Sequence, residues 1–268
     1  MSQTITIASG KGGVGKTSIA VNLALMLQGL GNRTTLMDVD FGLANAHIML
    51  GVNAKRTLSD VLSNGASIED VVEAGPNGLQ LLAGGSGTID LLHISQADRF
   101  ELIRRTDVLS SKTDILVIDA PAGAGDNTLD FIAASDRVVV VIVPEPTSFM
   151  DAYALIKSAN LERKLHRFSI VMNMESVAME AQKHFEKFRS IAMRFLDVEL
   201  TYLGHVPNSQ RMRRAVQDRR PVLVSTTNRQ SAEFMAFHDI AQRLQTAPKN
   251  DIAGIRFFGG ADGMSEKA

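Results

Sequence analysis

The sequence predicts an α/β fold: a doubly wound, mostly parallel sheet with helices on both of its faces. Short apolar runs rich in β-branched residues alternate along the chain with segments of helical period. Several runs are apolar at every position, which is typical of parallel strands buried on both sides. Ile19, Leu23 and Leu27 recur every four residues and predict a helix over residues 19–28. The expected strands are residues 4–8, 34–37, 79–82, 115–118, 138–143, 169–172 and 200–206.

A later segment places Phe185, Ile191 and Phe195 at a looser helical spacing, which predicts another helix with an apolar face. The chain shows no internal repeat and no linker rich in Pro, Gly or Ser. Its 268 residues are enough for one large core. We therefore expect a single domain over residues 1–246.

The composition shifts after Thr246, where prolines and glycines end any regular periodicity. Residues 247–268 are therefore expected to form a flexible tail. The tail holds a patch of two isoleucines and two phenylalanines, which would give weak membrane or partner binding, strengthened by dimerisation. A disordered tail, or one docked on its own domain, is the alternative. The apolar residues are Ile252, Ile255, Phe257 and Phe258.

The bulk composition excludes several classes of protein. The net charge of −1 provides no general attraction to nucleic acid or to an anionic membrane. The absence of cysteine excludes disulfides, thiolate zinc sites and cysteine-held iron–sulfur clusters. The longest apolar run, residues 138–143, is too short to span a bilayer. With no signal peptide in view, we expect a cytoplasmic protein.

A glycine-rich loop between the first strand and the first helix matches the phosphate-binding pattern G-x-x-x-x-G-K-[ST]. Glycines let backbone N–H groups converge on phosphate oxygens, and the helix N-terminus adds its dipole. Lys16 is expected to neutralise the β- and γ-phosphates of ATP, and the Thr17 hydroxyl to hold Mg²⁺. The nucleotide-binding residues are expected to be Gly10, Lys11, Gly12, Gly13, Val14, Gly15, Lys16, Thr17 and Ser18.

A second lysine, Lys11, stands near the start of this loop, giving the string K-G-G-x-G-K-[ST]. The string resembles the deviant phosphate loop of the MinD/ParA/NifH family of ATPases. The resemblance implies that the protein dimerises with ATP, and that Lys11 reaches the phosphates of the partner subunit. It also implies catalytic roles for Lys11, Lys16 and Asp40. The alternative for Lys11 is an ordinary solvated loop lysine.

Three aspartates end predicted strands and are candidates to complete the site. Asp38 and Asp40 share a face at the end of the second strand, and Asp119 ends the strand at 115–118. A buried strand ending in aspartate suits Mg²⁺, which prefers oxygen ligands. By resemblance to the MinD-like ATPases, Asp40 orients the attacking water and Asp38 supports Mg²⁺ through its water shell. Capping of the next helix is the alternative for one of the pair.

Two further strand ends are candidates for the base of the nucleotide. Asn173 ends the strand at 169–172, and Pro207 follows the strand at 200–206. In the MinD-like ATPases an asparagine and a proline-containing loop at these places frame the adenine ring, and an amide both donates and accepts hydrogen bonds. Glu145 also lies at a strand end, and the resemblance places it in the nucleotide sandwich. A turn residue without a ligand is the alternative for Asn173.

The resemblance extends over residues 4–245 and is most specific to the flagellar branch, FlhG/FleN (YlxH). The strings D-F-G-L-A-N-A-H from Asp40 and E-P-T-S-F-M-D-A-Y-A-L-I-K from Glu145 carry it. It implies a slow regulatory ATPase that limits flagellar number and placement. Its implied partners are an FlhF-like GTPase, a transcriptional regulator or a switch protein. Location at the inner membrane or cell pole is the alternative to a purely cytoplasmic one.

Other functions remain as alternatives or are excluded. The lack of cysteine excludes the redox and iron–sulfur carrier branches of the family. No substrate motif indicates a dethiobiotin synthetase-like ligase. A ParA- or MinD-type partitioning or division-site ATPase, binding DNA or membrane, remains the alternative. The basic stretch from Arg211 to Arg220 is the feature relevant to DNA, although a solvated helix face or a protein partner surface is favoured there.

Overall fold

A computed structural model describes residues 2–42, 44–85, 94–225 and 228–259. Its centre is an eight-stranded sheet in the order β3-β4-β2-β5-β1-β6-β7-β8, in which only the β3–β4 pair is antiparallel. The strands are β1 Gln3–Ser9, β2 Thr34–Asp38, β3 Val72–Ala74, β4 Gln80–Leu82, β5 Ile115–Ala122, β6 Arg137–Ile142, β7 Arg167–Asn173 and β8 Glu199–Val206.

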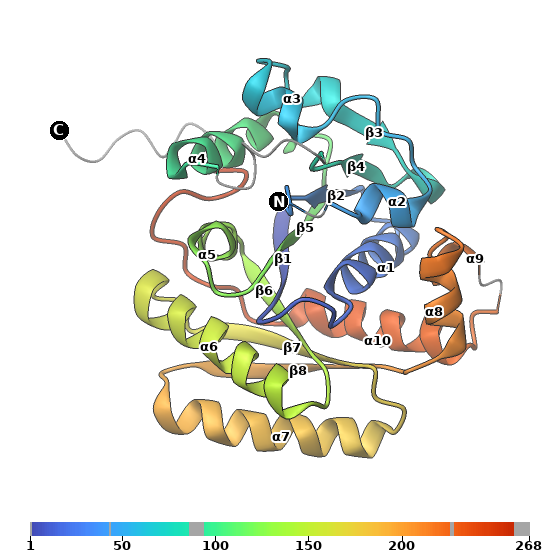
Figure 1. Cartoon of the computed structure of the whole chain (residues 1–268), viewed down its shortest axis with the longest axis vertical. Helices are drawn as coiled ribbons and strands as arrows, with labels where there is room; N and C mark the ends of the chain where they lie inside the picture. Colours follow the sequence, from blue (N-terminus) through green and yellow to red (C-terminus); the bar gives the residue numbers. More distant parts are fainter. Residues whose placement is uncertain (1, 43, 86–93, 226–227, 260–268) are drawn as a thin grey trace.

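Helices cover both faces of this sheet (Figure 1). α1 and α10 pack on one face, with α2, α8 and α9 beside them, and α4, α5, α6 and α7 lie over the other. The α-helices are α1 Lys16–Gly29, α2 Ala46–Leu50, α3 Leu58–Ser63, α4 Gln96–Arg105, α5 Asp126–Ala133, α6 Pro146–Arg163, α7 Ala178–Phe195, α8 Gln210–Gln217, α9 Val222–Ser225 and α10 Ala232–Thr246. Short 3-10 helices are Glu69–Val71, Pro76–Gly78 and Thr106–Leu109.

The predicted doubly wound fold is confirmed, as are all seven predicted strands and the first helix. The central strands are buried along both faces, which explains their uninterrupted apolar sequence. The prediction omitted β3, a three-residue antiparallel strand at the sheet edge. Its residues, Val72, Glu73 and Ala74, are too few to show a strand period.

The predicted apolar face of α7 is wrong for two of its three residues. Phe185 is buried as expected, but Ile191 and Phe195 are exposed. The residues that face the core instead follow spacings of three and four, so the true buried stripe is a regular helical one. It is formed by Ala181, Phe185, Phe188 and Ala192.

Residues 247–259 do not form the flexible tail that the sequence predicted, because they lie against the domain. The Asn250 side chain accepts a hydrogen bond from the Arg167 N–H (3.0 Å) and donates one to the Arg167 carbonyl oxygen (2.9 Å). Phe257 is 1% exposed, and its ring lies 6.4 Å from that of Phe131.

Three of the four residues of the predicted apolar patch therefore pack on the domain, since Ile255 and Phe258 lie partly buried against the core beside Phe257. Membrane contact through the tail stays a prediction. The composition change after Thr246 marked the end of the last helix and not the end of the packed domain. Residues 260–268 lie outside the described part of the chain, and the boundary at residue 246 stays a prediction.

Phe257→Ala is expected to lower the free energy of unfolding by about 3–5 kcal/mol, because it empties a fully buried site. Phe195, 66% exposed, provides the matched control. Phe195→Ala is expected to change the stability by less than about 0.5 kcal/mol. Urea unfolding of both variants checks this. Equal stabilities would contradict the docked position of Phe257.

Candidate functional site

The glycine-rich loop joins the end of β1 to the start of α1, in the middle of the sheet. Gly13 and Gly15 adopt φ angles of 81° and 82°, in the left-handed region that other residues rarely enter. Gly15 is the N-cap of α1 and brings no side chain to its first turn. The N–H groups that begin a helix have no partners within it. This turn is therefore open to an anion.

Two neighbouring elements hold the loop in place. A Cβ at Gly10 would lie 2.1 Å from the backbone carbon of Asp151, so the loop rests directly on the α6 backbone. On the other side the Asn173 side-chain amide donates a 2.7 Å hydrogen bond to the Val14 carbonyl oxygen. At Gly12, by contrast, the space is open, with no described atom within 4 Å of a Cβ position.

Lys16, the first residue of α1, forms a buried ion pair with Asp119 of β5. Its Nζ lies 2.5 Å from Asp119 Oδ1, and the two side chains are 7% and 1% exposed. A buried ammonium group needs such a partner, because removal from water is otherwise costly. Asp119 Oδ2 is buried and accepts no hydrogen bond from any described residue. One carboxylate oxygen is thus left available beside the loop.

Asp38 lies next to Asp119, in register on the adjacent strand. Its Oδ1 accepts a hydrogen bond from the Asp40 N–H (3.1 Å), and its Oδ2 accepts from the N–H groups of Asn45 and Ala46 (both 3.0 Å). Burial, and then the charge of Asp119, raises the pKa of Asp38 to about 7, against the opposing effect of the Ala46 N–H.

Asp38 therefore caps the start of α2, which is the alternative that the sequence left open for one of the two aspartates. Asp40 follows β2 at the same edge and is partly buried. The two carboxylates consequently have different surroundings. Asp38 is fixed by backbone N–H groups, and Asp40 lies nearer the solvent.

Lys11 reaches across the loop to the start of α6. Its Nζ lies 2.7 Å from Glu145 Oε2 and 2.9 Å from the Thr147 hydroxyl. The predicted site residues Lys11 and Glu145 are therefore in contact with each other. Both side chains are partly open to solvent, so this ion pair is of the weak, exposed kind.

The two residues predicted to frame the base lie on neighbouring strand ends. Asn173 pairs in register with Val206, and Pro207 follows directly. The Asn173 amide nitrogen, however, is used to support the loop at Val14. Pro207 borders a cavity of about 410 Å³ between α7 and α10, together with Tyr202 and His205.

The sequence analysis missed Asn22, a buried polar residue in α1. Its Nδ2 donates to the carbonyl oxygen of Ser18 (2.9 Å), and its Oδ1 accepts from the N–H of Leu223 in α9 (3.2 Å). Asn22 thus links the first turn of α1, with Thr17 and Ser18, to α9. An amide within the apolar run from Ile19 to Leu27 was the signal that could have identified it.

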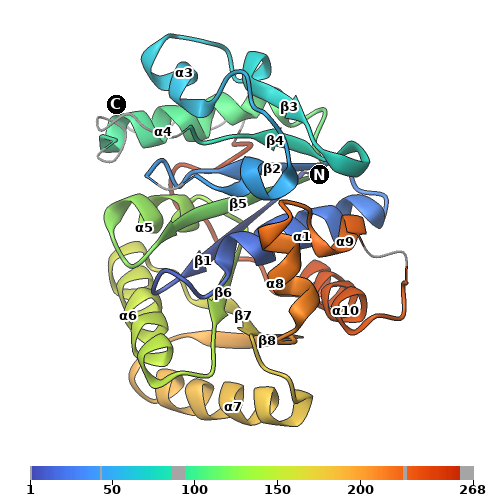
Figure 2. The same ribbon diagram turned by 45° about the vertical axis from the view of Figure 1, so that its right-hand side comes forward.

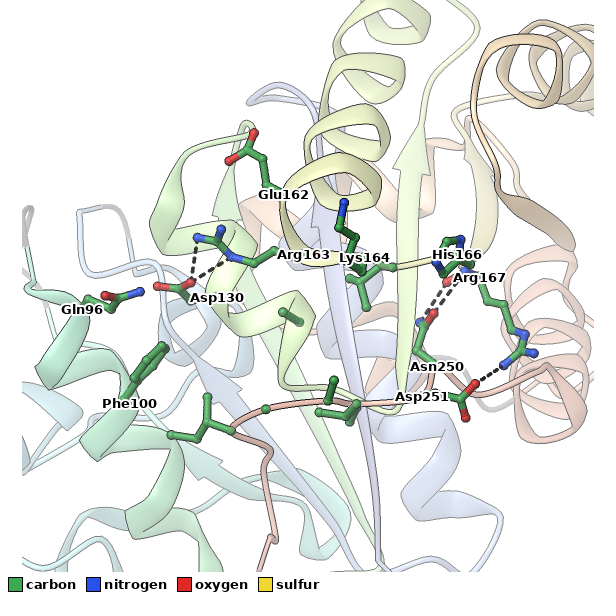
Figure 3. Close-up of a pocket in the computed structure, with 16 residues that line it drawn as sticks. Gln96, Phe100, Asp130, Glu162, Arg163, Lys164, His166, Arg167, Asn250 and Asp251 are labelled. Atoms are coloured by element: carbon green, nitrogen blue, oxygen red, sulfur yellow. Dashed lines mark hydrogen bonds and ion pairs between the residues drawn. The ribbon is translucent and has the colours of Figure 1, made fainter. Parts of the chain in front are cut away.

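A cavity of about 700 Å³ lies at the opposite edge of the sheet (Figure 3). Its wall includes Asp130 and Arg163, which form an ion pair (3.0 Å), and the Arg167–Asn250 contact. These groups join α5, α6 and residues 250–255, and they satisfy one another's charges and hydrogen bonds. The cavity is therefore separate from the loop.

Two features are absent from the part of the chain that the structure describes. No helix there is long and apolar enough to cross a membrane. No cluster of three or more His, Asp or Glu side chains in the described ranges is arranged to hold a metal ion by itself.

Comparison with known proteins places this loop in a family. A family model described as an AAA domain matches residues 2–171, and one described as NUBPL iron-transfer P-loop NTPase matches residues 101–245. The chain is 40% identical over 258 residues to the antiactivator FleN of Pseudomonas aeruginosa, covering 96% of this chain and 91% of that one. The chain belongs to the MinD/ParA family of P-loop ATPases.

Within this family, the predicted resemblance to the flagellar branch is confirmed. The flagellum site-determining protein YlxH of Helicobacter pylori is 36% identical over 217 residues, 81% of this chain and 73% of that one. Because this MinD/ParA-family chain has no cysteine, thiolates cannot carry the iron named in the second family description.

Solved structures of the family share the fold. The chain superposes on MinD of the MinC:MinD complex from Aquifex aeolicus with a TM-score of 0.75 at 23% identity, covering 96% of this chain and all of that one. MinD of Pyrococcus horikoshii, solved with Mg-ADP, gives a TM-score of 0.73 at 25% identity, covering 91% and 96%.

The packing of the loop gives a matched pair of substitutions. Gly10→Ala is expected to lower the free energy of unfolding by more than about 2 kcal/mol, because its Cβ would overlap the α6 backbone, which cannot move aside. Gly12→Ala enters open space and is expected to change stability by less than about 0.5 kcal/mol. Thermal or urea unfolding without nucleotide measures both. Equal stability of the two variants would show that the loop does not rest on α6.

Proposed function

We propose that this protein is a regulatory ATPase switch that controls flagellar number and placement. ATP with Mg²⁺ drives two copies together, and slow hydrolysis, stimulated by a partner, separates them. The names of the two flagellar relatives, an antiactivator and a flagellum site-determining protein, support the biological role. Their similarity extends over most of this chain.

The observation that carries the proposal is the loop with its buried Lys16–Asp119 pair. Lys16 and the N–H groups at the start of α1 would bind the phosphates, and Thr17 in the first turn would bind Mg²⁺. Oδ2 of Asp119, which accepts no hydrogen bond from the described residues, fits a role toward that ion, directly or through water. Bound Mg²⁺ would neutralise part of the triphosphate charge.

Asp38 and Asp40 are proposed to have different roles. The oxygens of Asp38 already accept hydrogen bonds from backbone N–H groups. This favours a supporting role for Asp38 through the water shell of Mg²⁺. Asp40, nearer the solvent, is the residue proposed to orient the attacking water. A positioned carboxylate of this kind contributes about 10²–10⁴-fold to a rate.

Lys11 provides a reason for the dependence on a second subunit. In one chain it pairs with Glu145, and exposed pairs of this kind are worth only about 0.2–1 kcal/mol. A triphosphate on a facing subunit would compete readily for the ammonium group. Asn173 and Pro207, at adjacent strand ends, are proposed to border the base, with Glu145 nearby.

The protein is proposed to act in the cytoplasm, where a slow, dimerising ATPase would act through a binding partner. The partners proposed from the family are an FlhF-like GTPase, a transcriptional regulator or a switch protein. The alternative, a partitioning or division-site ATPase, rests on the more distant MinD relatives, such as that of Bacillus subtilis at 28% identity. ATP-dependent retention of DNA, sensitive to salt, would favour that alternative.

Substitution of Asp40 tests the switch. Asp40→Ala is expected to reduce ATP turnover by at least about a hundredfold while leaving an ATP-bound dimer, because binding is kept and hydrolysis is lost. Size-exclusion chromatography with light scattering, with and without Mg-ATP, measures the dimer. A phosphate-release assay measures turnover.

Asp197→Ala is the control, since that side chain is 95% exposed and remote from the loop. It is expected to behave as the wild type in both assays. Wild-type turnover by Asp40→Ala would refute the role of Asp40. A wild-type protein that stays monomeric with Mg-ATP would refute the dimerising switch.

A further inference from the structure

The corner formed by α8 and α9 carries an unusual concentration of arginine. α8 and α9 lie side by side next to α1 (Figure 2). Between residues 208 and 230 the basic residues are all arginines, and Asp218 is the only acidic one. The chain as a whole has a net charge of −1, so this charge is local. The arginine surface consists of Arg211, Arg213, Arg214, Arg219, Arg220 and Arg229, all exposed.

The local fold directs these side chains outward. α8 packs Ala215 and Met212 against the core, and its three arginines face solvent. At its end the Arg220 N–H donates to the Ala215 carbonyl oxygen (3.0 Å), which turns the chain back on itself. Arg220 thereby joins Arg211 and Arg214 around a cavity of about 380 Å³.

Two of the three arginines around this cavity have no charged partner within the described part of the chain. Arg211 lies 3.8 Å from the buried carboxylate of Glu233. For Arg214 and Arg220, no carboxylate of the described residues lies within the 4 Å of an ion pair, and neither guanidinium makes a side-chain hydrogen bond there. Guanidinium groups are weakly hydrated and bind carboxylates in a two-point geometry. The cavity thus presents two unused binding groups of this kind.

We propose that this arginine surface docks an acidic segment of a partner polypeptide, whose carboxylates pair with Arg214 and Arg220. Ala215 and Val222 also line the cavity and offer the segment an apolar contact that a phosphodiester backbone would not use. Asp218 lines the cavity and repels any anion, so the cavity suits a segment with a few carboxylates better than a backbone with a phosphate at every nucleotide. The surface lacks the aromatic side chains on which single-stranded bases stack. These features favour polypeptide over nucleic acid.

The arginine surface gives the proposed switch a place to bind a partner, but docking there does not depend on ATP binding. Its test is therefore made without nucleotide, so that its failure is distinct from failure of the ATPase proposal. The probe is a fluorescein-labelled 16-residue peptide of glutamate and leucine at helical spacing, so that leucines line one face and glutamates the other. A second peptide with glutamine in place of glutamate shows whether charge is required. Fluorescence anisotropy with the full chain at low salt measures the dissociation constants.

The variant Arg214→Gln/Arg220→Gln removes the two unpaired groups and leaves Arg211 to neutralise Glu233. The control, Arg56→Gln/Arg104→Gln, removes the same charge from exposed sites near α3 and on α4. The acidic peptide is expected to bind the wild type and the control equally. Its affinity for the Arg214/Arg220 variant is expected to be at least about tenfold weaker, since two charge-assisted hydrogen-bonding groups are lost. Circular dichroism confirms that each variant is folded.

Three results would overturn the proposal. The acidic peptide could fail to bind the wild type, or the two double variants could bind it equally. A 20-base-pair DNA duplex, measured in the same assay, could bind more tightly than the peptide and lose affinity in the Arg214/Arg220 variant. That last outcome would assign the surface to nucleic acid.

Discussion

The buried ion pair between Lys16 and Asp119 is the interaction on which the rest of this site depends. An ammonium group removed from water needs a compensating charge, and here that charge comes from the next strand of the sheet. The pair fixes the first residue of α1 against the end of β5. It therefore positions both the glycine-rich loop, which precedes Lys16, and the row of N–H groups that follows it. A triphosphate in the loop would offer Lys16 a second anion at the same place.

The order of the strands explains why the necessary groups meet. β5 lies between β1 and β2, so the loop after β1, Asp119 and Asp38 share one edge of the sheet. Two carboxylates in register within a buried region repel each other, and burial alone disfavours their charge. The raised pKa of Asp38 is the consequence. Three backbone N–H groups donate hydrogen bonds to Asp38, and together with the ammonium group of Lys16 they counteract this cost. Their arrangement keeps two acidic groups side by side where a cation is expected.

The phosphate-binding loop and the buried strands were predictable from the sequence because the signals for them are local. The loop pattern spans eight residues, and strands buried on both sides have a distinctive apolar composition. Long-range partners were not predictable. The amide of Asn173 bonds to Val14, 159 positions away, and nothing in the surrounding sequence distinguishes that role from a contact with the base. The same limit applies to Phe257, whose burial depends on a space beside Phe131 that forms only in the folded chain.

The central claim is that the loop with its buried lysine binds adenine nucleotide, and titration calorimetry with Mg-ATP tests it most directly. The wild-type protein is expected to bind with a stoichiometry near one nucleotide per chain, as is a Lys187→Ala control, in which a lysine on the exterior of α7 is replaced. Lys16→Ala is expected to show no binding. A folded wild-type protein that took up no nucleotide, or Lys16→Ala binding as well as the wild type, would contradict the account.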